Sequence, residues 1–238
     1  MPFRHSVTIV ASPRSRVGKT LLARLLTDFH AQQGREVHAF DLNSGGGTLA
    51  AFLPDRTTAA EIASTKGQIA LFDRLIADDG VTKVVDLGHE SFSGFFALAA
   101  QLGFVEEAHR RAIAPAILFV ITPDATAVEA YGGLRSRFPL ATLAPLHNEI
   151  FGAAQHRGKY DLTGSALIHL AALAPGLRKS IETPPFCFAD AALANSAIPL
   201  AVQTELQVWL RRVWREFREL DLRILLAELQ SSIGLGNA

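Results

Sequence analysis

Gly18, Lys19 and Thr20 are the residues whose types and order point most clearly to chemistry. They lie between an apolar segment near the N-terminus and a run of leucines at helical spacing. In such an arrangement a strand aims a short loop, backbone N–H groups of the loop surround phosphate oxygens, and the helix N-terminus adds its positive dipole end. We expect Lys19 to reach the β- and γ-phosphates of a nucleotide and Thr20 to hold Mg²⁺. Residues 6–26 therefore predict a phosphate-binding loop.

The loop departs from the usual Gly-x4-Gly-Lys-[Ser/Thr] pattern, because Pro13 stands in place of the first glycine. An ordinary strand-turn-helix with a surface lysine is the alternative interpretation. The flanking elements favour the nucleotide, since Val7 to Val10 form an apolar run before the loop and Leu21 to Leu26 give helical spacing after it.

Strand and helix signals alternate along the chain. Strands are expected at 36–42, 83–86 and 116–122, and helices at 18–33 and 93–103. The last of these strands is a continuous apolar run bounded by prolines, which is typical of a buried parallel strand. This alternation predicts an α/β fold with a doubly wound, mostly parallel sheet and helices on both faces, in three layers. No repeat or linker divides the chain, so we expect a single domain over 1–238.

Asp41 and Asp86 each end a predicted strand, which places both at the carboxyl edge of a parallel sheet beside the loop. Carboxylates at that edge would position Mg²⁺ or its waters near the γ-phosphate. Each aspartate could instead cap a helix. The N–H of Gly88 could contact the γ-phosphate, so that the turn after Asp86 distinguishes ATP from ADP. His89 invites a catalytic role, but a solvated loop histidine is the simpler interpretation.

The bulk properties permit a nucleotide-binding protein and exclude other classes. Formal net charge is +0, so no global charge attracts the chain to nucleic acid or to an acidic surface. Cys187 is the only cysteine, which excludes an internal disulfide framework and fits a reducing compartment. The apolar stretches are shorter than the roughly 20 residues that span a bilayer, and no segment has a signal-peptide pattern. We expect a cytoplasmic protein.

These motifs resemble those of the deviant Walker A ATPases, the class of P-loop NTPases that contains ParA and MinD. The loop of that class, Lys-Gly-Gly-x-Gly-Lys-[Thr/Ser], matches Arg14 to Thr20, and its two switch motifs match Asp41-Leu42-Asn43 and Asp86-Leu87-Gly88. The middle of the chain is similar to conjugal-transfer ATPases of plasmids, on residues 85–92, 138–139 and 147–152.

The resemblance implies an ATP-binding switch protein, with a role in plasmid transfer or partitioning. It assigns nucleotide binding to Arg14, Ser15, Arg16, Val17, Gly18, Lys19, Thr20 and Gly88. It assigns Mg²⁺ to Thr20, Asp41 and Asp86, and the catalytic roles to Lys19, Arg14 and Asp41. Asn148, at the end of a late strand, would hydrogen-bond the adenine; stabilising a turn is the alternative role for this side chain.

Three departures from the family pattern alter what we expect. Arg14 stands where the family has a lysine that reaches across an ATP-dependent homodimer, and an arginine can also bind phosphate in trans. Ser15 and Arg16 replace glycines, which reduces the freedom of the backbone to approach phosphate. Asn43 replaces an aspartate that supports hydrolysis, and an amide cannot accept a proton as a carboxylate can. We therefore expect a Mg²⁺-dependent ATPase with slow or impaired hydrolysis.

Two other functions stay open. Ser15 to Thr20 is similar to half of the loop of dethiobiotin synthetase and related ATP-dependent ligases, although no second cluster of Lys, Arg and hydroxyl residues marks a pocket for an acid substrate. A degenerate relative could instead be a non-hydrolysing scaffold. A ligase needs a co-substrate for turnover, a switch dimerises with ATP, and a scaffold does neither.

The C-terminal part predicts a long helix over about 202–229, with a heptad seam of apolar residues from Leu206 to Ile224. A neighbouring stripe that could bind DNA non-specifically consists of Arg211, Arg215 and Arg218. Interleaved acidic residues weaken its field, so we expect a helix packed on the sheet with a solvated charged face. Residues 229–238 carry no Lys or Arg, which argues against a membrane-targeting helix.

Overall fold

The computed structural model describes most of the 238 residues of the chain. The described residues are 5–43, 48–152, 158–162, 165, 167–191 and 199–234, without the side chains of 228 and 230–234. The glycine-rich residues 44–47 and the last residues 235–238, which the sequence interpretation included, lie outside this description.

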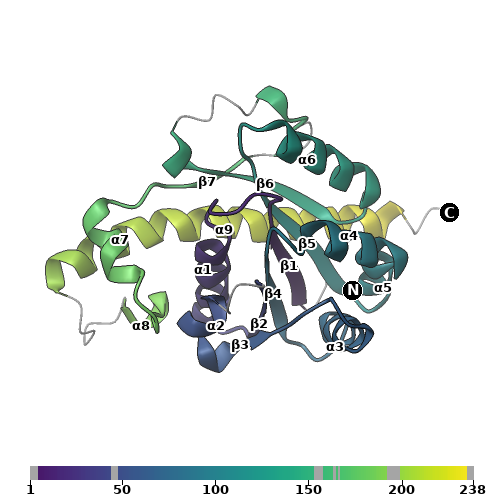
Figure 1. Cartoon of the computed structure of the whole chain (residues 1–238), viewed down its shortest axis with the longest axis horizontal. Helices are drawn as coiled ribbons and strands as arrows, with labels where there is room; N and C mark the ends of the chain where they lie inside the picture. The colour runs from purple at the N-terminus through teal and green to yellow at the C-terminus, as the bar shows by residue number, and fades with distance from the viewer. Residues whose placement is uncertain are drawn as a thin grey trace.

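The described chain forms one seven-stranded sheet in the order β3-β2-β4-β1-β5-β6-β7, and every neighbouring pair of strands is parallel (Figure 1). The strands are β1 (His5–Ala11), β2 (Val37–Leu42), β3 (Thr57–Ala59), β4 (Thr82–Leu87), β5 (Ile113–Val120), β6 (Thr142–Asn148) and β7 (Ile168–Leu170). The chain builds the β2 side of the sheet first and then crosses to the β5 side. The carboxyl end of β1 therefore lies at the topological switch point, where ligands bind in open α/β sheets.

Helices cover both faces of this sheet (Figure 1). They are α1 (Lys19–Gln32), α2 (Thr48–Phe52), α3 (Thr65–Leu75), α4 (Phe92–Gln101), α5 (Phe104–Arg110), α6 (Ala125–Arg137), α7 (Pro175–Ile181), α8 (Phe188–Ala191) and α9 (Leu200–Gly234), with the short turns η1 (Pro54–Arg56) and η2 (Glu149–Phe151). One apolar core joins the sheet to α1, α7, α8 and α9, and the other joins it to α3, α4, α5 and α6. The predicted doubly wound, three-layer α/β fold is confirmed.

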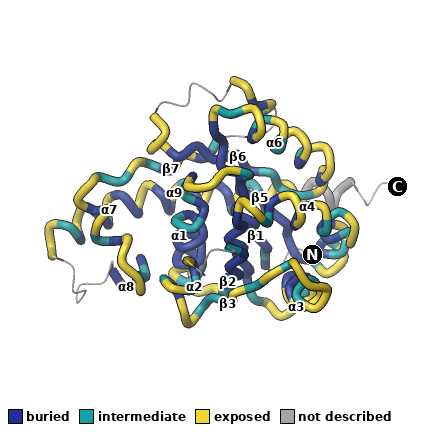
Figure 2. The backbone as a smooth tube through the Cα atoms, in the orientation of Figure 1, coloured by how far each residue is buried: buried dark blue, intermediate teal, exposed yellow. Residues whose placement is uncertain are grey.

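The central strands are buried on both faces (Figure 2), and every residue of β4 and β5 is buried. The prediction placed the second of these strands at 116–122 with prolines as its limits, and here it was wrong, because Pro115 lies inside β5. Pro115 pairs in register with Val7, whereas pairing with β6 begins only at Ala116. A residue without an N–H is tolerated there because the strand has no partner yet on its β6 side.

The last helix, α9, is longer than the predicted 202–229 and runs along the face of the sheet that α1 also covers (Figure 1). Its apolar seam from Leu206 to Ile224 is buried against α1 and the strands β5 to β7. The arginines of the neighbouring stripe, Arg211, Arg215 and Arg218, are exposed. Among the described residues, none of the helices combines the length and apolar character needed to cross a membrane.

Candidate functional site

The loop from Ser12 to Gly18 connects β1 to α1 at the carboxyl edge of the sheet. Gly18 precedes the helix with φ +93, a left-handed conformation that favours glycine. A Cβ at this position would lie 2.7 Å from Nδ2 of Asn148, so a larger residue would collide with β6. Arg16 is also left-handed, with φ 59, although it carries a side chain. The loop thus holds a strained shape at the position where the family pattern has glycine.

Lys19, the first residue of α1, is buried and turned back over the loop. Its Nζ donates a hydrogen bond to the carbonyl oxygen of Arg14 at 2.6 Å. Burial lowers the pKa of Lys19, and the nearby Asp86 carboxylate partly opposes this effect. The carbonyl of Arg14 is a neutral partner for this buried cation. A phosphate in the loop would give Lys19 an anionic partner instead.

Thr20, Asn43, Asp41 and Asp86 form one hydrogen-bonded group next to Lys19. Asp41 and Asp86 are register partners on the neighbouring strands β2 and β4. Thr20 Oγ1 donates to Asp86 Oδ2 at 2.7 Å, and Asn43 Nδ2 donates to the same oxygen at 2.8 Å. Asn43 Nδ2 also donates to Asp41 Oδ1 at 2.7 Å. The structure therefore brings together the three residues that the sequence assigned to Mg²⁺.

The two carboxylates of this group differ in how they are used. Asp41 Oδ2 accepts hydrogen bonds from the backbone N–H groups of Leu49, at 2.8 Å, and Ala50, at 3.1 Å, at the start of α2. Asp41 therefore holds a helix end, which is the alternative role that its sequence position allowed. Asp86 Oδ1, in contrast, is buried and has no hydrogen-bond partner in the described part of the chain.

Burial of the Asp86 carboxylate destabilises the fold when the group is ionised. The side chain is 0% exposed, and burial, assisted by the charge of Asp41, raises its pKa to about 6 against the hydrogen bonds from Thr20 and Asn43. An unpartnered oxygen on a buried carboxylate fits a cation or a cation-bound water. Within the described ranges no group of three or more His, Cys, Asp or Glu could hold a metal by itself. Mg²⁺ does not need such a group, because it is usually bound by one or two carboxylates together with substrate phosphates and waters.

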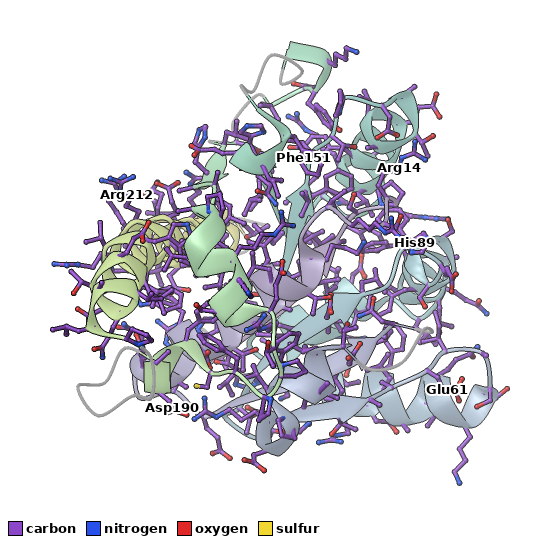
Figure 3. The ribbon with its side chains drawn as sticks, turned by 60° about the vertical axis from the view of Figure 1, so that its left-hand side comes forward. Arg14, Glu61, His89, Phe151, Asp190 and Arg212 are labelled. Carbon is purple, nitrogen blue, oxygen red and sulfur yellow. The ribbon has the colours of Figure 1, made fainter. Side chains whose placement is uncertain are left out.

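Gly88 lies directly after β4 and is buried, whereas the next residue, His89, is exposed. A Cβ on Gly88 would lie 2.7 Å from the carbonyl oxygen of Leu42, so only glycine fits between the ends of β2 and β4. His89 lies on the same side of the molecule as Arg14 (Figure 3). Its exposure agrees with a solvated loop histidine.

Arg14 is exposed with its neighbours Ser15 and Arg16. Its Nε forms an ion pair with Asp124 Oδ1 at 3.2 Å, so its side chain is directed to a residue of its own chain. Asp124 also caps α6 by accepting from the N–H of Ala127 at 3.1 Å. Sequence reasoning did not anticipate this partner, because 110 positions separate the two residues and both lie in loops.

A cavity of about 270 Å³ lies beside the loop, on the β6 and β7 side of α1. It is lined by Arg16, Gly18, Leu21, Arg24, Asn148, Ile150, Leu170, Ala171, Leu173, Pro175, Arg178, Ile181 and Glu182. Asn148 stands between the cavity and the loop: its Nδ2 donates to the carbonyl of Val17 at 3.1 Å, and its Oδ1 accepts from the N–H of Ile150 at 3.2 Å. The amide is therefore already used to support the loop and a turn.

Arg24 is a lining residue that sequence reasoning missed. It lies on α1 and is 3% exposed, on the same buried helix face as Asp28 four positions later. An arginine and an aspartate spaced by four, among apolar neighbours such as Leu25 and Phe29, are a signal of a buried polar contact, because such residues are almost never buried without partners.

Comparisons with known proteins identify the fold and not the family. No protein-family model matches the chain, and no curated protein matches it. The solved structure of the MinC:MinD cell division complex from Aquifex aeolicus matches with a TM-score of 0.55 and 14% identity, over 87% of this chain and 95% of that chain. The MinD cell division protein from Aquifex aeolicus matches with a TM-score of 0.51 and 15% identity, over 87% and 96%. The chain has a MinD-like P-loop NTPase fold.

The ParA/MinD-like fold expected from the loop and switch motifs is thereby confirmed. At identities this low, the likeness concerns the fold alone. The similarity to conjugal-transfer ATPases, like the assignment of single residues to nucleotide and Mg²⁺, stays a prediction.

Proposed function

We propose that this chain is an ATP-binding switch protein that uses Mg²⁺ and hydrolyses ATP slowly. The observation that carries the proposal is the buried Asp86 beside Lys19, with Thr20 and Asn43 hydrogen-bonded to one oxygen of its carboxylate. Burying an ionised carboxylate with a free oxygen destabilises a fold, and such perturbed groups cluster at functional sites. Here the group lies at the carboxyl edge of the sheet, where this type of fold binds ligands.

Phosphate binding would come from the loop, Lys19 and the N-terminus of α1. The first N–H groups of a helix have no partner within the helix and point toward an anion that binds at this end. Lys19 would exchange the carbonyl of Arg14 for the β- and γ-phosphates.

Mg²⁺, when bound, would neutralise charge between the β- and γ-phosphates. Thr20 would hold it with its hydroxyl, and Asp86 would hold it or its waters through the oxygen that has no partner among the described residues. Asp41 would act less directly, because both of its oxygens already accept hydrogen bonds. Gly88 would present its N–H to the γ-phosphate from the end of β4.

The base would occupy the cavity next to the loop, which is lined mainly by apolar side chains. Asn148 would contact the adenine from the β6 side while its amide continues to support Val17. This arrangement resembles small-molecule sites in general, which are concave, mostly apolar and provided with a few polar groups.

Slow hydrolysis follows from the chemistry of Asn43. Its side-chain N–H₂ donates to both Asp41 and Asp86, so it holds the two carboxylates together. An amide cannot take a proton from an attacking water, and a general base typically contributes about 10² to 10⁴ in rate.

ATP would favour a homodimer in which Arg14 faces the nucleotide of the partner. This step requires Arg14 to leave Asp124, and the exposed position of its side chain allows the movement. The exposed Arg211, Arg215 and Arg218 would bind DNA non-specifically, as in plasmid transfer or partitioning, and the acidic residues near them would weaken this binding. Arg212, next to these residues on α9, lies on the opposite side of the molecule from Arg14 (Figure 3).

Sedimentation velocity with a fluorescent ATP analogue and Mg²⁺ separates this proposal from the ligase and the scaffold. We expect the nucleotide to sediment with a dimer of the wild type and not with Lys19→Ala. Lys179→Ala serves as the control, because this lysine is exposed on α7 and does not line the cavity. Nucleotide that sediments with a monomer would favour the ligase, and nucleotide that sediments with neither form would favour the scaffold.

A further inference from the structure

Arg24 is a buried arginine that touches two separate parts of the fold from the middle of α1. Its Nη2 donates to the carbonyl oxygen of Ile181 at 2.9 Å and lies 3.5 Å from that of Phe186. Its guanidinium carbon stands 3.6 Å from the centre of the Phe52 ring. Arg24 therefore lies between the segment 181–188 on one side and α2 on the other.

The segment 181–188 forms part of the wall of the base cavity, through Ile181 and Glu182. It is fixed to α1 a second time by Asp28, whose Oδ2 accepts from the N–H of Phe188 at 2.6 Å. Arg24 and Asp28 thus hold this wall from the same face of one helix. A base that enters the cavity would meet Arg24, Ile181 and Glu182 together.

Phe52 belongs to the other half of the nucleotide site. It is the last residue of α2, and the first turn of this helix donates to Asp41 through the N–H groups of Leu49 and Ala50. The carbonyl oxygen of Phe52 accepts from the N–H of Phe186 at 3.2 Å. The helix that donates to Asp41 and the wall of the base cavity are therefore in contact, and Arg24 touches both.

We propose that Arg24 is a positioning residue that couples occupancy of the base cavity to the position of α2 and Asp41. Closing the cavity around a base would fix Ile181. The hydrogen bond that Arg24 donates to the carbonyl oxygen of Ile181 would then fix the guanidinium plane, and the Phe52 ring under that plane would fix the end of α2. The inference rests on the proposed nucleotide site. It adds that a base bound in the cavity changes the position of α2 and Asp41, at the phosphate end of the site, through these contacts.

An arginine is suited to this role and a lysine is not. The guanidinium is planar, so one face can stack on Phe52 while its edge donates to a carbonyl. A lysine at the same position keeps the charge but offers a point charge on a flexible stem, without a plane to orient. Arg24→Lys should therefore break the connection between the cavity and α2.

Hydrogen exchange measured by mass spectrometry with adenosine alone tests the coupling, because adenosine has no phosphate to reach Lys19 or Asp86. In the wild type we expect saturating adenosine to slow exchange in 175–182 and, by about five-fold or more, also in 48–53. In Phe52→Leu, which removes the ring and keeps Arg24 and the cavity lining, we expect adenosine to slow exchange in 175–182 only. In Arg24→Lys, whose affinity for adenosine is measured first because Arg24 lines the cavity, we expect no slowing in 48–53 at a saturating concentration.

Arg74→Lys is the matched control, since Arg74 also lies over a phenylalanine ring, 5.0 Å from the centre of Phe40, and does not line the cavity. It should keep both effects of adenosine. Unchanged exchange in 48–53 of the wild type, or protection there that survives in both Arg24→Lys and Phe52→Leu, would overturn the coupling. ATP binding is measured alongside: if ATP binds and adenosine leaves α2 unchanged, only the coupling is wrong, and if ATP does not bind, the proposed function is wrong and the coupling with it.

Discussion

Replacing Asp86 with asparagine should stabilise the nucleotide-free protein at neutral pH and weaken the Mg²⁺-dependent binding of ATP. Burial raises the pKa of Asp86 to about 6 from 3.8. Between these two values the folded state retains a proton that the unfolded state has released. The stability of the wild type therefore decreases as the pH rises through this range, and the full loss is present above about pH 6.

The size of this loss follows from the two pKa values. They differ by about 2 pH units, and each unit corresponds to about 1.4 kcal/mol, so ionised Asp86 destabilises the fold by about 3 kcal/mol. Asparagine keeps an oxygen that can accept from Thr20 and Asn43. Its N–H₂ group, however, replaces the oxygen that has no partner among the described residues, at a cost of about 1 kcal/mol or more. The variant should be about 1 to 2 kcal/mol more stable than the wild type at pH 8 and about 1 kcal/mol less stable at pH 3.5.

Urea unfolding of both proteins between pH 3.5 and 8, without Mg²⁺ or nucleotide, measures this difference. Other titrating groups are common to the two proteins and cancel in the comparison. We expect the difference in free energy of unfolding to change sign within the range. A difference that does not vary with pH would refute the reasoning, because it would mean that folding does not raise the pKa of Asp86.

Three further predictions concern the nucleotide. The affinity of the wild type for Mg²⁺ and ATP should fall by about ten-fold per pH unit below pH 6, where Asp86 takes up its proton, and calorimetric titrations at several pH values measure it. Asn43→Asp should raise the rate of phosphate release by about ten-fold or more, because a carboxylate can accept the proton of the attacking water. It should also lower the melting temperature without Mg²⁺, because it adds a third carboxylate within 3 Å of two others. An unchanged rate would mean that Asn43 does not limit hydrolysis. Asp124→Asn keeps a cap for α6 and frees Arg14, so half-maximal dimerisation should need about two-fold less ATP by sedimentation, whereas a need for more ATP would speak against the role of Arg14.

The parts of the site that lie near one another in sequence, or at the ends of strands, could be predicted. Asp41 and Asp86 were expected at the same edge because parallel strands end together, and they are register partners in the sheet. Gly18 was expected in the loop, and its left-handed backbone and its closeness to Asn148 explain why glycine is needed there. The spacing of apolar residues reports where strands and helices lie, and a parallel sheet brings the carboxyl ends of its strands to one edge.

The contacts between distant side chains could not be predicted. Arg24 bonds to Ile181 and Arg14 to Asp124, and neither pair follows from spacing or helix periodicity. Which side chains meet depends on the path that each loop takes across the sheet. A sequence pattern does not specify that path. The predicted limits of β5 were wrong for a related reason, since Pro115 is tolerated only because the pairing of β5 with β6 begins one residue later, at Ala116.

Calorimetric titration of the wild type with ATP, in the presence and absence of Mg²⁺, measures the nucleotide binding on which the proposed function depends. We expect binding of one ATP per chain, with a dissociation constant in the micromolar range that rises at least about ten-fold when Mg²⁺ is removed. No heat of binding with Mg²⁺ and ATP, at protein concentrations where a micromolar site would be saturated, would contradict the proposed function.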